Sequence, residues 1–329
     1  MFSLHTIDSS VAEWKKILRK NFTRIGELAD FLELTNEQRK KILFHPNFAL
    51  QVPYRLAQKM AKGTLDDPIF KQFIPLQEEL VKNPLFIQDP VSDLFFQKES
   101  KLLQKYEGRV LLMPTGACAM HCRYCFRQNF PYSTKKSMEE EIRKIAEDSS
   151  IQEVILSGGD PLSLSDESLD SLLSSLSSIP HIRRIRFHTR FPIGIPERID
   201  ESFLAVLRKV SQQIFFVIHC NHPRELDEDF FVRLKQLQLM GCIILNQAVL
   251  LRGVNDDEAT LIELAKMLAN HGILFYYLHQ IDRVQGAAHF EVDEKKGAWL
   301  IDRIAQHLPG YAVPRYVKEI AGEPYKTML

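Results

Sequence analysis

Residues 107–127 have the sequence EGRVLLMPTGACAMHCRYCFR, and this stretch decides the fold. It contains a short apolar run, RVLLM at 109–113, and a loop with three cysteines in a C-x3-C-x2-C spacing. The apolar run has the length and composition of a buried strand. Similar runs recur, about thirty residues apart, along the rest of the chain. They are EVILS (153–157), RIRFH (184–188), IFFVIH (214–219), IILNQAVL (243–250) and LFYYLH (274–279).

Segments with helical periodicity lie between these runs and begin with capping residues such as Ser137, Ser165 and Asp257. The serine-rich stretch 163–178 has leucines at helical spacing, which predicts an amphipathic helix rather than a low-complexity linker. Alternating strands and helices indicate βα units and a parallel sheet. Six units predict an α/β fold, a partial (β/α)6 barrel; an open doubly wound sheet is the alternative that the pattern leaves open.

Residues 1–105 lack this alternation and are expected to form an N-terminal helical cap or arm. Thr35 and Gln38 have the spacing of a capping box, which predicts a helix after Thr35. The expected division of the chain is therefore a helical region at 1–105 and, at 106–329, a barrel with a C-terminal segment.

The composition excludes several classes of protein. Lys plus Arg and Asp plus Glu are equal at 42 each in 329 residues, so net charge supports neither a nucleic-acid nor a membrane partner. The N-terminus lacks a signal-peptide pattern, and no apolar stretch is long enough to span a bilayer. Five cysteines form a poor disulfide framework, so we expect a metal or redox site and a cytoplasmic location. Cys220 and Cys242 are expected to be buried and without a chemical role.

Polar residues follow the predicted strands at their carboxyl ends, where barrel enzymes carry their active sites. The cysteine loop follows the first strand, and Ser157-Gly158-Gly159-Asp160 follows the second. His219 ends the fourth strand, Gln247 lies late in the fifth, and Asp282 follows the sixth. These residues are expected to meet at one end of the barrel.

The three clustered cysteines, Cys118, Cys122 and Cys125, predict an iron–sulfur site. Thiolates are the ligands of such clusters, and a cubane usually takes four of them. Three cysteines would leave one iron open to chelate the amino and carboxylate groups of S-adenosylmethionine (SAM). A zinc site with His121 as fourth ligand is the alternative, although the adjacent His121 and Cys122 would struggle to share one ion.

The cysteine loop resembles the C-x3-C-x-aromatic-C motif of the radical SAM superfamily, with Tyr124 in the aromatic position. Ser157-Gly158-Gly159-Asp160 is similar to the glycine-rich segment with which that superfamily approaches the amino group of SAM; an ordinary strand-to-loop turn is the alternative. The resemblance implies a [4Fe–4S] cluster on the three cysteines and bound SAM.

The C-terminal residues 311–329, YAVPRYVKEIAGEPYKTML, place Lys326 after a Gly/Pro turn. Such a lysine can form a Schiff base with pyridoxal phosphate (PLP), although a lone terminal lysine is ordinarily just solvated. From about residue 51 onward, however, the chain resembles the lysine 2,3-aminomutase family, which uses a cluster, SAM and PLP together. The segments that carry this resemblance are VPYRLAQKM, DPIFKQFIP, EGRVLLMPTGACAMHCRYCFR, SGGDPLSLSD, HCNHPRE, NQAVLLRGVND and the Pro/Gly-rich end before Lys326.

The family resemblance implies a role for seven residues. Lys326 would hold PLP, and Arg109 would contact its phosphate. Arg127 would bind the substrate carboxylate, and Asp282 and Glu319 would bind the substrate ε-ammonium. His219 and Gln247 would lie near SAM. Glu319 departs from the family, which has Asp there, and the longer side chain puts lysine binding in doubt. The sequence also stops three residues after Lys326 without the family's zinc-binding cysteines, and Asp257 replaces a further zinc ligand, so no structural zinc is expected.

The segments HQIDRVQGAAHF (279–290) and AGEPYK (321–326) are similar to a short subgroup that converts L-α-lysine to (R)-β-lysine for the modification of translation elongation factor P. This resemblance implies L-lysine as substrate, an electron donor such as flavodoxin or ferredoxin, and a link to elongation factor P and its ligase. An aminomutase for glutamate or arginine, and a radical SAM enzyme that modifies RNA or protein directly, are the alternatives. The sequence leaves open whether the chain forms a homo-oligomer.

Overall fold

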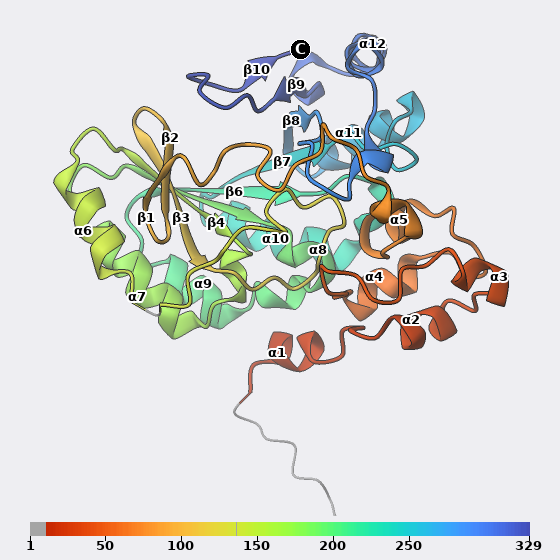
Figure 1. The fold of residues 1–329 in the computed structure, drawn as a ribbon. Coiled ribbons are helices and arrows are strands. Elements are labelled where there is room, and N and C mark those ends of the chain that lie inside the picture. Colours follow the sequence, from red (N-terminus) through yellow and green to blue (C-terminus); the bar gives the residue numbers. More distant parts are fainter. Residues whose placement is uncertain (1–10, 136) are drawn as a thin grey trace, which may run out of the picture.

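The computed structural model describes residues 11–135 and 137–329, and ten strands form one sheet in chain order (Figure 1). Each of the six predicted strands is present and lies parallel to the next. They are β3 (Arg109–Thr115), β4 (Glu153–Gly158), β5 (Arg184–Thr189), β6 (Gln213–His219), β7 (Ile243–Val249) and β8 (Leu274–His279). Within the described residues no pairing joins the two edge strands, so the barrel is open and the predicted partial barrel is confirmed.

Four strands were not predicted. β1 (Gln97–Glu99) and β2 (Leu102–Tyr106) extend the sheet antiparallel to β3, so the predicted boundary at residue 105 falls within a strand. Tyr106 pairs with Arg109 across a two-residue turn, and Gly108 in that turn has φ +72°. At the other edge, β9 (Arg315–Lys318) adds a seventh parallel strand beside β8, and β10 (Thr327–Met328) folds back antiparallel to it.

The helices that connect the parallel strands lie outside the curved sheet (Figure 1). These helices are α6 (Glu139–Glu147), α7 (Asp166–Ser177), α9 (Glu201–Leu207), α10 (Glu228–Leu239), α11 (Glu258–Asn270) and α12 (Glu294–Ala305). Ser165 caps α7, whose leucines are buried as its amphipathic pattern predicted. Asp257 caps α11 by accepting a hydrogen bond from the Thr260 amide at 2.9 Å, which gives this residue a structural role.

The N-terminal region is helical up to residue 73 and packs against the side of the barrel (Figure 1). Its helices are α1 (Glu13–Leu18), α2 (Ile25–Phe31), α3 (Asn36–Arg39), α4 (Tyr54–Lys59) and α5 (Pro68–Phe73). The capping box of Thr35 and Gln38 is present. Trp14 meets Phe191 of the short helix α8 (Phe191–Gly194) edge-on, with ring centroids 5.6 Å apart. This region and the barrel therefore share one apolar core.

Short 3-10 turns complete the chain: η1 (Gln77–Leu80), η2 (Pro161–Ser163), η3 (Pro196–Arg198), η4 (Pro223–Glu225), η5 (Ala288–Phe290) and η6 (Gly310–Ala312). No helix among the described residues has the length and apolar character needed to cross a bilayer.

Candidate active site

One cavity of about 770 Å³ occupies the inside of the barrel, with side chains from every parallel strand in its wall. Eight of the predicted site residues line it: Arg109, Arg127, Ser157, His219, Gln247, Asp282, Glu319 and Lys326. The three cysteines, Tyr124, Gly158, Gly159 and Asp160 do not line this cavity. The predicted residues thus form two groups, one around the cavity and one around the cysteine loop.

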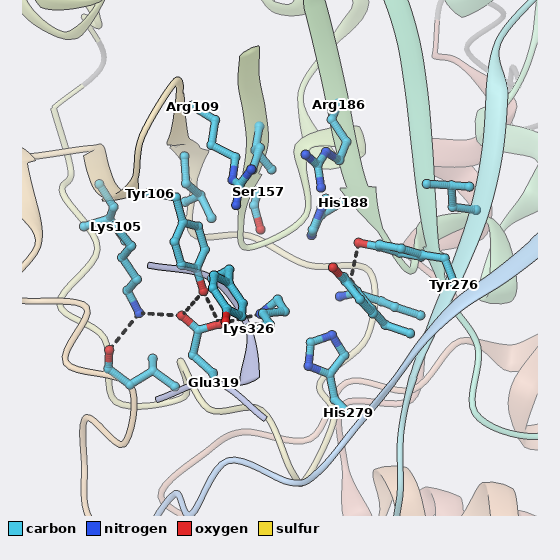
Figure 2. A pocket seen from close by; sticks show the side chains of 18 of the residues that line it. Lys105, Tyr106, Arg109, Ser157, Arg186, His188, Tyr276, His279, Glu319 and Lys326 are labelled. Atoms are coloured by element: carbon cyan, nitrogen blue, oxygen red, sulfur yellow. Dashed lines mark hydrogen bonds and ion pairs between the residues drawn. The ribbon is translucent and has the colours of Figure 1, made fainter. Parts of the chain in front are cut away.

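The β9–β10 hairpin brings Glu319 and Lys326 together. Thr327 pairs with Lys318, so the residues just inside the loop, Glu319 and Lys326, face each other. Lys326 Nζ lies 2.5 Å from a Glu319 carboxylate oxygen, and the Tyr106 hydroxyl donates to both oxygens at 2.7 Å. Figure 2 shows Lys105, Tyr106 and Lys326 converging on this carboxylate. Burial alone would raise the pKa of Glu319, but the Lys326 charge and these hydrogen bonds lower it.

Asp282 is the second carboxylate of this wall. Burial raises its pKa to about 7; the Lys326 charge opposes this shift and the Glu319 charge adds to it. A carboxyl group that titrates near neutral pH inside a cavity marks a candidate functional site. Asp282 therefore changes its charge within the physiological range.

Arg127 lines the cavity with only 9% of its surface exposed. Its Nε donates to Asp93 at 2.6 Å, while its terminal Nη1 makes only a long 3.4 Å contact with Ser157 Oγ. Lys105 binds the other oxygen of Asp93 at 2.7 Å. Asp93 thus orients the guanidinium, and its terminal nitrogens remain suited to a carboxylate.

Neutral imidazoles also line the cavity. Burial, together with the Arg190 and Arg127 charges, lowers the pKa of His219 to about 3. His219 Nε2 lies 3.0 Å from the Gln247 amide nitrogen, as their register on adjacent strands requires. The buried Nε2 atoms of His188 and His279 have no hydrogen-bond partner among the described residues. Since unpaired buried polar atoms are costly, both favour a polar ligand in the cavity.

A second group of cations lines the cavity, and of these only Arg109 was predicted. It comprises Lys105, Arg109, Arg184, Arg186 and Arg315. Glu153 offsets part of this charge through a 2.8 Å bond from Arg186 Nε. On β5, Arg184 and Arg186 alternate with buried Ile185 and Phe187. Charged residues at every second position of a central strand were the signal that could have located this group.

The cysteine loop lies next to the cavity. Burial raises the pKa of the Cys118 thiol, and the charges of Asp160, Cys125 and Cys122 add to this shift. Burial, together with the Cys122 charge, raises the pKa of Cys125 to about 11. Among the described residues, no trio of His, Cys, Asp or Glu side chains lies close enough to share a single metal ion, whereas a four-iron cubane takes each thiolate on a different iron. His121 Nδ1 is bonded to the Ala49 carbonyl at 2.8 Å, and its ring stacks on Phe48.

The glycine-rich segment packs directly on the cysteine loop. Gly159 has so little space that an added Cβ would lie 2.4 Å from the Ala117 carbonyl oxygen, and Gly158 has φ +104°. The Asp160 amide donates to the same Ala117 carbonyl at 2.7 Å. The Asp160 carboxylate accepts from Thr189 Oγ1 and the Arg190 amide, both at 2.8 Å, so it joins two loops instead of facing the cavity.

Gly159→Ala is expected to displace the cysteine loop and to lower the iron content after anaerobic reconstitution. Overpacking of this kind costs about 1–3 kcal/mol, and here the strain falls on backbone that precedes Cys118. Gly310→Ala is the control, because an added Cβ there has nothing within 4 Å. Equal iron content in the two variants would show that the close approach is unimportant for the cysteine loop.

Known proteins with similar sequences identify the family. A family model described as the radical SAM superfamily matches residues 112–265. Proteins named L-lysine 2,3-aminomutase from Escherichia coli (strain K12) and Haemophilus influenzae are 42% and 39% identical to this chain. The first match covers 86% of this chain and 83% of the E. coli protein. The second covers 96% of this chain and 95% of the H. influenzae protein. A protein of that name from Clostridium subterminale is 32% identical over 97% of this chain and 80% of its own length.

The comparisons agree with the fold and with the cysteine loop, which lies within the matched radical SAM segment. The zinc-module and open-sheet alternatives are therefore set aside. The chain belongs to the lysine 2,3-aminomutase family of radical SAM enzymes.

Proposed function

We propose that the protein is an isomerase that converts L-α-lysine to (R)-β-lysine, with a [4Fe–4S] cluster, SAM and PLP as cofactors. The observation that carries this proposal is a cavity that holds the Lys326 amine, the Asp282 and Glu319 carboxylates and the Arg127 guanidinium together. Two anions and one cation match the charges of a bound lysine, which has one carboxylate and an ε-ammonium. Glutamate would place its side-chain carboxylate against two others, which disfavours it.

The residues around the cavity and those of the cysteine loop suit the proposed cofactors. Cys118, Cys122 and Cys125 would hold the cluster and leave one iron open to SAM. SAM would lie among Tyr124, the segment 157–160, His219 and Gln247. Some of these residues would act by positioning the cysteine loop. Arg109, with the neighbouring cations, would bind the PLP phosphate, and Lys326 would attach PLP. The cluster and SAM would supply radical hydrogen abstraction, and PLP would supply an aldehyde that binds the migrating amino group.

Glu319 is suited to serve two amines in turn. In the structure its carboxylate pairs with the Lys326 ammonium at 2.5 Å. While PLP is attached to Lys326 Nζ, Glu319 would lack this partner and would be available for the ε-ammonium of an arriving lysine beside Asp282. The Tyr106 hydroxyl, bonded to both carboxylate oxygens, would hold Glu319 in place throughout. The longer side chain of Glu relative to Asp is thus compatible with lysine binding.

The other residues around the cavity would orient the substrate and exclude water. Arg127, fixed by Asp93, would bind the α-carboxylate, and Asp282 and Glu319 would bind the ε-ammonium. A substrate held at both ends keeps its carbon 3 in one position, which lowers the barrier to abstraction of one hydrogen. The β9–β10 hairpin covers this side of the cavity and would limit the access of solvent to reactive species.

Lysine binding is expected to strengthen as pH rises through about 7 and to level off above it. Burial raises the Asp282 pKa to about 7, so the carboxyl is neutral below that pH and ionised above it, while the substrate ε-ammonium stays charged throughout. Below the pKa, affinity should fall by up to about tenfold per pH unit. Equilibrium dialysis of labelled lysine against the unreduced, cofactor-loaded enzyme between pH 5.5 and 8.5 measures this.

Asp282→Asn should bind lysine more weakly and lose this pH dependence. Asp256→Asn is the control, because Asp256 lies outside the cavity and pairs with Lys296. A pH dependence that persists in Asp282→Asn would assign the titration to another group.

We also propose that the product serves elongation factor P, on the strength of the segments 279–290 and 321–326 described above. In this scheme a flavodoxin or ferredoxin reduces the cluster, and a ligase attaches the product to the factor. All five cysteines are free, which is compatible with the reducing cytoplasm. Mass spectrometry of elongation factor P, incubated with the ligase and the enzyme's purified product, tests the link; an unmodified factor beside a modified control with synthetic (R)-β-lysine would contradict it.

A further inference from the structure

Arg190 is a buried cation in direct contact with the cysteine loop. It follows β5, and only 5% of its surface is exposed. Its Nη1 donates to Cys122 Sγ at 2.9 Å and also to the Tyr124 hydroxyl. Its backbone amide is held by the Asp160 carboxylate at 2.8 Å. The guanidinium is therefore fixed against one of the three clustered sulfurs.

The other side of Arg190 faces a buried counter-charge. Nη2 donates to Glu225 Oε2 at 2.7 Å and to Gln72 Oε1 at 2.6 Å. Glu225 is fully buried, and its other oxygen accepts hydrogen bonds from the Asn221 and His222 amides. Arg190, the cation of this pair, contacts the Cys122 sulfur directly. Glu225 contacts Arg190 and reaches the sulfur only through it.

Buried charges of this kind affect the reduction of an iron–sulfur cluster. Reduction adds one negative charge, so a nearby cation stabilises the reduced form and a nearby anion destabilises it. Hydrogen bonds to the ligating sulfurs act in the same direction as the cation. Because both groups are removed from solvent, neither effect is strongly screened.

We propose that Arg190 raises the reduction potential of the cluster bound at Cys122, and that Glu225 offsets part of this effect. The inference rests on the proposed function, which assigns the cluster to the three cysteines. Arg190 acts on the cluster through a ligand and is a tuning residue; it has no part in binding lysine. The pair sets how strong a reductant the enzyme needs before SAM can be cleaved.

The test is a redox titration of the reconstituted full-length enzyme, followed by the electron paramagnetic resonance signal of the reduced cluster, without lysine or PLP. Arg190→Met should lower the potential so that, at a fixed solution potential near the wild-type midpoint, the ratio of reduced to oxidised cluster falls about tenfold. Arg190→Lys keeps the charge and should restore most of that ratio. Glu225→Gln should shift the potential in the opposite direction, above that of the wild type.

The surface pair of Glu201, in α9, and Arg208, which follows this helix, provides matched controls. Arg208→Met and Glu201→Gln make the same chemical changes at an exposed site and should leave the potential unchanged. A merely structural role for Arg190 would loosen the loop in both buried variants, so shifts of the same sign would overturn the proposal. No shift in Arg190→Met would overturn it as well.

If Arg190→Met fails to assemble a cluster, Glu225→Gln decides alone: a raised potential supports the proposal and an unchanged or lowered one contradicts it. Failure of the cluster assignment, the part of the proposed function on which this inference rests, would look different. In that case the wild-type protein itself would lack iron and the resonance signal of a reduced cubane.

Discussion

Replacement of Lys326 by alanine is expected to reduce β-lysine formation by more than about a thousandfold, while the iron content and SAM binding stay at wild-type levels. The reason is that Lys326 carries the amine proposed to attach PLP. Among the described residues, one other lysine lines the cavity: Lys105, which is held by Asp93 and the Val91 carbonyl, both at 2.7 Å. Mass spectrometry of the products from L-lysine measures the loss.

The same hairpin offers a control. Lys318 precedes Glu319 but lies outside the cavity and pairs with Glu294 at 2.6 Å, so Lys318→Ala should retain activity. Borohydride treatment of the PLP-loaded wild-type enzyme should fix the cofactor to the peptide that contains Lys326. Normal β-lysine production by Lys326→Ala would remove the basis for the PLP assignment.

Cys122→Ala is expected to remove the brown iron chromophore after anaerobic reconstitution and, with it, all reductive cleavage of SAM. Two remaining thiolates cannot replace three ligands of an open cubane, and Arg190 would lose the Cys122 sulfur as a hydrogen-bond acceptor. Iron and sulfide analysis, together with the visible spectrum, measure the loss.

Cys242→Ala makes the same substitution at a buried cysteine that is not part of the loop and should keep the full iron content. An unchanged iron content in Cys122→Ala would argue against a cluster on this loop. The two cysteine variants together separate loss of a ligand from general damage to the fold.

The six central strands could be predicted because their apolar runs are long enough to stand out between amphipathic helices. The edge strands could not be predicted in this way. β9 and β10 have four and two residues, and they acquire their pairing from β8 and from each other. β2 was missed although Glu107-Gly108 is a tight-turn signal before β3.

The site was predicted unevenly for a related reason. Residues at strand ends, such as His219 and Asp282, follow from the barrel rule, whereas Glu319 and Lys326 needed the family resemblance. The contact of Arg190 with Cys122 joins positions 68 residues apart, so no local sequence pattern could predict it. Asp160 was assigned to cofactor binding, but its carboxylate accepts four protein hydrogen-bond donors and positions the loop after β5.

The most direct test of the central claim is the product formed from L-lysine by the reconstituted enzyme with SAM, PLP and dithionite under anaerobic conditions. We expect (R)-β-lysine, resolved from α-lysine by chiral chromatography and mass spectrometry. Conversion of glutamate or arginine while lysine stays unchanged would contradict the proposed activity. Release of 5′-deoxyadenosine without any β-amino acid would contradict it as well.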